Sequence, residues 1–182
     1  MFGKPEPTPE PLTESAFLQF LEEGRRSFPN IQLSNMSLLN VDLRMMDLSG
    51  AELRNVDMRG ANLTNANISG AKLQHVDLRG SHMFHCNLQK VACVTVDLSG
   101  TNMHAANLQE AELARVQLRA VQLVQANLQR ANLQESNLQG ANLLQADLRF
   151  ANLRFANLTE ANIKDVQWDN ADLHKAKMPE SK

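Results

Sequence analysis

Between residues 141 and 158, leucine occurs at every fifth position. An α-helix places residues on one face every 3.6 positions and a β-strand every two, so neither element alone accounts for this spacing. Stepping by five from Leu33 to Met178 gives 30 positions without an insertion, of which 22 are leucine and none is charged. A chain with this pattern must repeat one small structural unit along most of its length.

A second apolar column lies two residues before the first and runs from Ile31 to Ala176, with 15 alanines and 8 valines. It also contains no charged residue, although 21% of the chain is charged. Two inward and three outward residues in every five predict a short extended segment followed by a corner. Gly and Asn recur two positions after the first column, as at Gly60 and Asn65, and both residue types tolerate the positive φ of a tight turn.

A fixed short period over most of a chain is typical of a solenoid. The repeated A(D/N)Lxx motif, as at residues 61–65 and 146–150, resembles the pentapeptide-repeat family over residues 31–178. This resemblance implies an all-β solenoid, a right-handed quadrilateral β-helix with four pentapeptides in each coil. Thirty repeats would then form about 7.5 coils.

The N-terminal residues have a different composition. Residues 1–12 are rich in proline and predict a flexible lead. Residues 13–30 predict a short α-helix and a segment connecting it to the first coil, with Thr13 as N-cap and Gly24 ending the helix.

The predicted helix has one apolar face, formed by Phe17, Phe20 and Leu21. This face predicts a cap over the open edge of the first coil, and a partner-binding amphipathic helix is the alternative. The G-x-R-x-F stretch at Gly24, Arg26 and Phe28 resembles the segment that leads into the first coil of cyanobacterial pentapeptide-repeat proteins.

The C-terminal end has less sequence beyond the repeats, only the tail 179–182. Trp168 replaces leucine near this end, where it would plug the last coil or leave it to stack on another subunit. The sequence therefore predicts a monomer or an end-to-end homodimer through the C-terminal coil. Quinolone-resistance members of the family carry a C-terminal dimerising helix, to which nothing here corresponds.

Charge and cysteine content exclude several classes. The 182 residues carry a net charge of −2, which predicts no direct binding to nucleic acid, and no stretch is apolar enough to predict a membrane span or an N-terminal signal peptide. Cys86 and Cys93 occupy inward columns and do not suggest a disulfide framework. We therefore expect a cytoplasmic protein.

Four aromatic residues gather on one predicted side of the coil: His82, Phe84, His85 and His104. Histidine clusters bind metals, but no acidic residue accompanies this one, so we expect a surface cluster and predict no metal and no cofactor. No phosphate loop or hydrolase motif is present either, so the sequence predicts a protein that is not an enzyme.

The outward apolar residues indicate a contact site. Phe150 and Phe155 occupy successive corner positions, and Leu144 is near them in the sequence. Exposed apolar clusters often mark protein interfaces, so these three residues are the first candidate for partner contact and the histidine cluster is the second.

The outward charged residues form columns with a spacing of 20. Asp57, Asp77 and Asp97 make one column, and a neighbouring arginine column begins with Arg59 and Arg79. Like charges in adjacent coils repel, so we expect the arginines to offset the aspartates.

Two functions remain on these grounds. The first is a non-enzymatic protein-binding or scaffold module, since a stiff rod without catalytic motifs suits protein contact. The alternative comes from the resemblance alone, because some family members mimic DNA and bind or protect type II topoisomerases such as gyrase. That role requires a strongly acidic surface, which a net charge of −2 does not favour.

Overall fold

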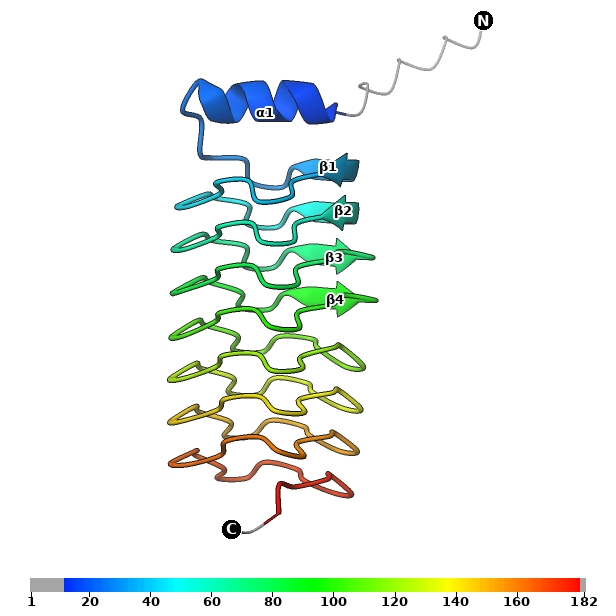
Figure 1. Ribbon diagram of the computed structural model, residues 1–182, viewed down its shortest axis with the longest axis vertical. Helices are drawn as coiled ribbons and strands as arrows, with labels where there is room; N and C mark the ends of the chain where they lie inside the picture. Colours follow the sequence, from blue (N-terminus) through cyan, green and yellow to red (C-terminus); the bar gives the residue numbers. More distant parts are fainter. Residues whose placement is uncertain (1–11, 181–182) are drawn as a thin grey trace, which may run out of the picture.

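The computed structural model describes residues 12–180, which form a rod of stacked coils with one helix at its N-terminal end (Figure 1). The parallel β-bridges join residues 20 positions apart, for example Asp42 with Asn62 and Asp47 with Asn67. A coil therefore contains 20 residues, in four sides of five. The predicted flexible lead lies outside the described residues except for Leu12.

Four β-strands stack along one side of the rod in the order β1-β2-β3-β4 and form a parallel sheet. They are β1 (Gln32–Ser37), β2 (Glu52–Asp57), β3 (Lys72–Gln74) and β4 (Ala92–Val94). The register pairs Leu33 with Leu53 and Leu73 with Cys93, so equivalent residues lie directly above one another. Elsewhere, the coils are joined by isolated parallel bridges with the same spacing.

Both apolar columns point inward, as the pattern predicts. From Leu33 to Ala161 their side chains are buried, except that of Val41, which is partly buried, and they form one continuous core along the axis. Two of the polar residues in these columns satisfy their hydroxyl groups locally: Thr101 Oγ1 donates to the Leu98 carbonyl at 2.8 Å and Ser136 Oγ donates to the Leu133 carbonyl at 2.7 Å. The last coil is open, and Trp168 there is only partly buried.

The corners are also as predicted. The residue two positions after each inward leucine has a positive φ, for example 63° at Gly60 and 58° at Asn65. Gly60 additionally lies against Asn40 Oδ1, which leaves no space for a Cβ atom. The geometry is imposed at every corner, however, and 24 residues other than glycine adopt it within residues 12–180.

The helix α1 (Glu14–Glu22) covers the first coil (Figure 1). Thr13 is the N-cap, and its Oγ1 accepts a hydrogen bond from Ala16 N at 3.3 Å. Phe17 is fully buried with its ring 5.3 Å from that of Phe28, and Glu14 Oε2 accepts a hydrogen bond from Ser37 N at 2.8 Å. These contacts support the capping interpretation of the helix.

Candidate functional site

One wall of the rod lacks formal charge over five consecutive coils. It consists of residues 61–65, 81–85, 101–105, 121–125 and 141–145, which contain no Asp, Glu, Lys or Arg. We call this surface the neutral wall. Its outward positions carry asparagine, glutamine, histidine and apolar side chains.

The other three walls differ from the neutral wall over the same coils, since each carries five charged residues. These are Lys90, Glu110, Arg130, Asp147 and Arg149 on the second wall; Lys72, Glu112, Arg115, Glu135 and Arg154 on the third; and Asp77, Arg79, Asp97, Arg119 and Glu160 on the fourth. The absence of charge is therefore a property of one wall rather than of the repeat.

An apolar column runs along the neutral wall. It contains Phe84, His104, Val124 and Leu144, each one coil below the last. Backbone hydrogen bonds fix this stacking: His85 N donates to the His104 carbonyl at 3.0 Å, and the next coils repeat the bond. All four side chains are half-buried.

The structure thus regroups the predicted site residues. Leu144 stacks below Val124 on the same wall as the histidine cluster, whereas Phe150 lies at the end of the next wall. Sequence reasoning assigned Leu144 and Phe84 to separate patches, although their spacing of 60, three whole coils, was available as a signal.

The aromatic cluster is tightly packed. The rings of Phe84 and His104 stack with centroids 4.8 Å apart and an interplanar angle of 5°, and His85 meets Phe84 edge-on at 4.3 Å. His82 is exposed on the same segment. Within residues 12–180, no group of three His, Cys, Asp or Glu residues is arranged to hold a metal ion.

Phe150 and Phe155 project from two successive corners. Their exposed fractions are 53% and 44%, and their φ angles are 62° and 60°. The Arg130 guanidinium lies 5.6 Å from the Phe150 ring centroid, and the Lys175 ammonium lies 5.4 Å from that of Phe155. Each ring is therefore a solvent-facing aromatic with a cation on one face.

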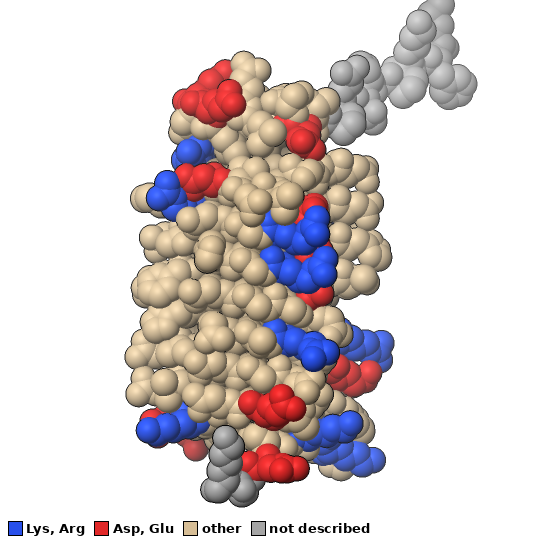
Figure 2. Space-filling view, in the orientation of Figure 1, with Lys and Arg blue, Asp and Glu red and all other residues tan. Residues whose placement is uncertain are grey.

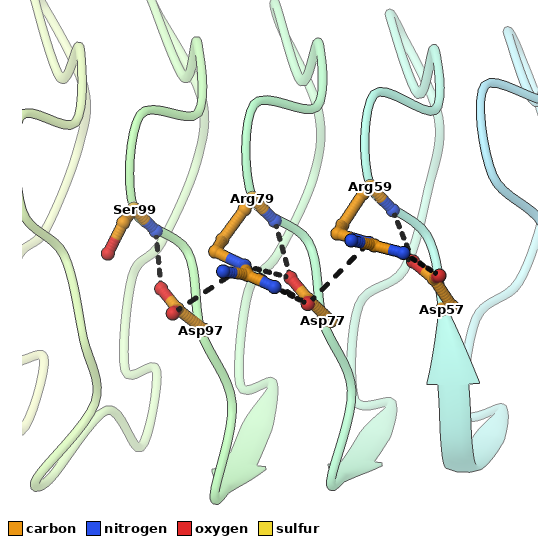
Figure 3. Close-up of polar contacts among 6 residues, drawn as sticks. All are labelled: Asp57, Arg59, Asp77, Arg79, Asp97 and Ser99. Atoms are coloured by element: carbon orange, nitrogen blue, oxygen red, sulfur yellow. Dashed lines mark hydrogen bonds and ion pairs between the residues drawn. The ribbon is translucent and has the colours of Figure 1, made fainter.

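The predicted offset of aspartates by arginines is confirmed on the fourth wall (Figure 3). Arg59 Nη2 lies 2.7 Å from Asp57 Oδ2, and its Nε lies 3.8 Å from Asp77 Oδ2 in the next coil. Arg79 repeats the arrangement, at 2.6 Å from Asp77 and 3.9 Å from Asp97. We call this set of residues the Asp–Arg ladder.

These ion pairs predict a loss of stability in acid. Hydrogen bonds from arginine side chains lower the pKa of Asp57 and Asp77, and the one from Arg44 lowers the pKa of Asp42 to about 2. Because the folded pKa lies below the ordinary value of about 4, the stabilisation is present above pH 4 and is lost as the pH falls through the folded pKa. We expect the urea midpoint, followed by circular dichroism, to fall between pH 5 and about pH 2. A constant midpoint over this range would contradict the prediction.

On the face of the rod that Figure 2 shows, charged side chains lie in small groups, several with acidic and basic side chains side by side, and wide uncharged areas separate the groups. The two cysteines are buried and free, and burial raises the pKa of the Cys93 thiol to about 12. The structure has one short helix in residues 12–180, and it is neither long nor apolar enough to cross a bilayer.

Family models decide what kind of chain this is. The model for pentapeptide repeats, in eight copies, matches residues 27–65, 47–80, 126–165 and 151–182, and a model for a pentapeptide repeat region matches residues 75–143. The chain belongs to the pentapeptide-repeat family. Its fold is the right-handed quadrilateral β-helix of that family, with a short N-terminal helix. No curated protein sequence matches the chain.

Several solved structures are similar to this pentapeptide-repeat chain. HetL, a protein from Nostoc sp. strain PCC 7120 involved in regulating heterocyst differentiation, is 25% identical, with 91% of this chain and 94% of that chain covered and a TM-score of 0.26. A protein from the Arabidopsis thaliana thylakoid lumen is 21% identical over 67% and 71%, with a TM-score of 0.41. QnrB1, a plasmid-mediated fluoroquinolone resistance protein, is 20% identical over 80% and 82%, with a TM-score of 0.37.

Proposed function

We propose that this pentapeptide-repeat protein is a non-enzymatic protein-binding module whose main contact surface is the neutral wall. The observation that carries the proposal is the presence of charged residues on the second, third and fourth walls and their absence from the neutral wall over the same five coils. Charged groups are depleted from the centres of protein interfaces because their desolvation is costly. The neutral wall is therefore the face of the rod that a partner covers at the lowest cost.

The apolar column supplies the favourable part of such a contact. Burying the exposed portions of Phe84, Val124 and Leu144 removes apolar surface from water, and the amide side chains beside them donate and accept hydrogen bonds. The wall is also stiff, since every coil is hydrogen-bonded to the next. A rigid surface loses little conformational entropy on binding.

Phe150 and Phe155 form a second contact region in this proposal. A bulky residue with positive φ is strained, and burial of the ring does not offset the strain because both rings are about half exposed. Aromatic residues beside cations are common anchors in protein interfaces. This second region thus consists of the two corners that bound residues 151–155 of the third wall, away from the neutral wall.

The distribution of charge argues against a DNA-mimicking role toward topoisomerases. A DNA mimic presents rows of uncompensated negative charge, whereas the aspartates of the Asp–Arg ladder are bridged by arginines at 2.6–3.9 Å.

The two buried, unpaired cysteines agree with a reducing compartment, and we propose that the binding activity belongs to the cytoplasm.

Affinity capture from a bacterial, preferably cyanobacterial, lysate tests the proposal. The double variant Val124→Glu/Leu144→Glu places two charges on the neutral wall, and Gln89→Glu/Gln109→Glu places two at the equivalent outward positions of the second wall as a matched control. We expect the wild type and the control to capture the same protein. The neutral-wall variant should capture about tenfold less of it, or less still. Circular dichroism verifies that all three are folded.

Equal capture by all three proteins would overturn the assignment to the neutral wall. Phe150→Glu/Phe155→Glu is run in parallel, and loss of capture by that variant alone would move the contact to the two corners. Light scattering on the purified wild type distinguishes a monomer from the end-to-end homodimer that the open C-terminal coil predicts.

A further inference from the structure

Between the coils that residues 12–180 form, the stacking is interrupted at the third wall, opposite the neutral wall. In the coils of β1 and β2 the strand continues through the corner, and the corners Leu73–Val76 and Cys93–Val96 have no hydrogen bond from the fourth residue to the first within residues 12–180. The next corner has this bond, from Val116 N to the Leu113 carbonyl at 3.3 Å. We call corners without this bond wide and corners with it tight. On this wall, the wide corners therefore lie directly above the tight corners.

Two backbone hydrogen bonds between adjacent coils are missing where the two corner types meet, and one of them is the bond from Gln117 N to the Val96 carbonyl. His75 N donates to the Val94 carbonyl at 3.0 Å, and Arg115 N donates to the Gln134 carbonyl at 2.9 Å. Between them, the corresponding bond from Thr95 N to the Ala114 carbonyl is absent, and neither group has another hydrogen-bond partner among the described residues. Two donors, Thr95 N–H and Gln117 N–H, and two acceptors, the Ala114 and Val96 carbonyls, are thus left open at this step among the described residues.

A groove of about 1100 Å³ lies at the same place. All four open backbone groups belong to residues that line it, and Val94, which is 56% exposed, contributes an apolar surface. Asp97 and Glu112 also line the groove. Its six Asp, Glu, Lys and Arg residues are four acids and two arginines, so their net charge is −2.

The Asp–Arg ladder ends in this groove without its last cation (Figure 3). Asp57 and Asp77 are each paired with an arginine two residues later, but the residue two positions after Asp97 is Ser99. The Ser99 N–H still donates to Asp97 Oδ1 at 2.9 Å, as the arginine N–H groups do in the coils above. The backbone frame of the ladder is therefore repeated, while the guanidinium is not.

The other negative charges of the groove differ in their pairing. Glu135 is bound by Arg115 at 2.9 Å. Glu112 accepts a hydrogen bond from Asn132 Nδ2 at 2.9 Å and has no ion pair within residues 12–180. Asp97 is reached only by Arg79, at 3.9 Å, in the same described range. Two carboxylates thus face the groove without a close cation.

We propose that this groove binds an extended segment of a partner protein that carries an arginine side chain. The guanidinium occupies the place of the missing ladder cation and pairs with Asp97, an adjacent apolar side chain covers Val94, and the backbone of the segment bonds to Thr95 N–H and the Ala114 carbonyl. Carboxylates bind guanidinium groups through paired, charge-assisted hydrogen bonds, which makes arginine the best complement. This site lies on the wall opposite the neutral wall and does not depend on that surface.

The test uses a defined peptide, acetyl-Ala-Val-Arg-Val-Ala-amide, and its neutral twin with citrulline in place of arginine. Each is titrated into the ¹⁵N-labelled full chain, and amide resonances are followed by NMR. We expect saturable shifts at Thr95, Ala114 and their neighbours with the arginine peptide, and at least about tenfold weaker binding of the citrulline peptide. Absence of saturable shifts, equal binding of both peptides or shifts away from the groove would each overturn the proposal.

Three variants test the position of the guanidinium. Ser99→Arg supplies the missing cation from within the chain without removing any group, so we expect it to weaken binding of the arginine peptide by about tenfold or more, whereas Ser99→Gln, long but neutral, binds within about twofold of the wild type. Asp97→Asn keeps the acceptor for Ser99 N–H but should also lose binding. Undiminished binding of the arginine peptide by the folded Ser99→Arg protein would refute the proposed site. Weakened or undiminished binding here leaves the proposal for the neutral wall unaffected.

Discussion

Replacing Leu128 by aspartate should prevent the rod from folding at ordinary expression temperatures. Leu128 is fully buried, with Leu108 and Leu148 one coil above and below it, both of which are also fully buried. An aspartate there would be an unpaired charge in a dry interior, at a cost of several kcal/mol, which is comparable with the whole stability of a small domain. We expect insoluble protein, or a soluble fraction that has lost the β-type circular dichroism spectrum.

The control for this experiment is Gln125→Asp. Gln125 lies three residues before Leu128, at the corner that ends the preceding pentapeptide. Gln125 is exposed at a corner with φ of 57°, a conformation that aspartate tolerates well. We expect its free energy of unfolding, from urea titration, to remain within about 0.5 kcal/mol of the wild type. A soluble Leu128→Asp protein with an unchanged spectrum would show that the core accommodates charge, which the packed leucine column does not permit.

The sequence contains enough information to predict the rod because inward and outward positions never exchange. The uninterrupted column from Leu33 to Met178 determines whether each residue points into the core or outward. The Gly and Asn residues two positions later mark where the chain turns. Four sides per coil did not follow from the period of five, however. That number came from the resemblance, and once it was known, the spacing of 20 placed Asp57 above Asp77 correctly.

The sites were harder to predict because they depend on which columns become neighbours. Leu144 was grouped with Phe150 by distance along the chain, whereas the stacking places it with Phe84, three coils above. The groove could not be predicted, because the residues around Thr95 fit the repeat as well as those around Arg115 do. The difference between their corners is a matter of hydrogen-bond geometry, and no residue type at either corner marks it.

The two ends of a solenoid are its only open edges, and this makes α1 the second sensitive element. Phe17 is its most buried residue, and it packs edge-on against Phe28 at 5.3 Å. Phe17→Ala removes the ring from a closed site, and such truncations cost about 3–5 kcal/mol. We expect a lower urea midpoint together with concentration-dependent self-association in light scattering, because the uncovered first coil exposes unpaired backbone groups to other chains.

Gln19→Ala is the matched control, since Gln19 lies on the exposed face of the same helix and bonds only to Glu23, at 2.9 Å. It should leave both the midpoint and the molecular mass unchanged. If Phe17→Ala behaved like Gln19→Ala, the helix would contribute nothing to the stability of the rod. Its apolar face would then have to be explained by a binding partner, the alternative that the sequence left open, because a buried phenylalanine that caps the coil cannot be removed without loss of stability.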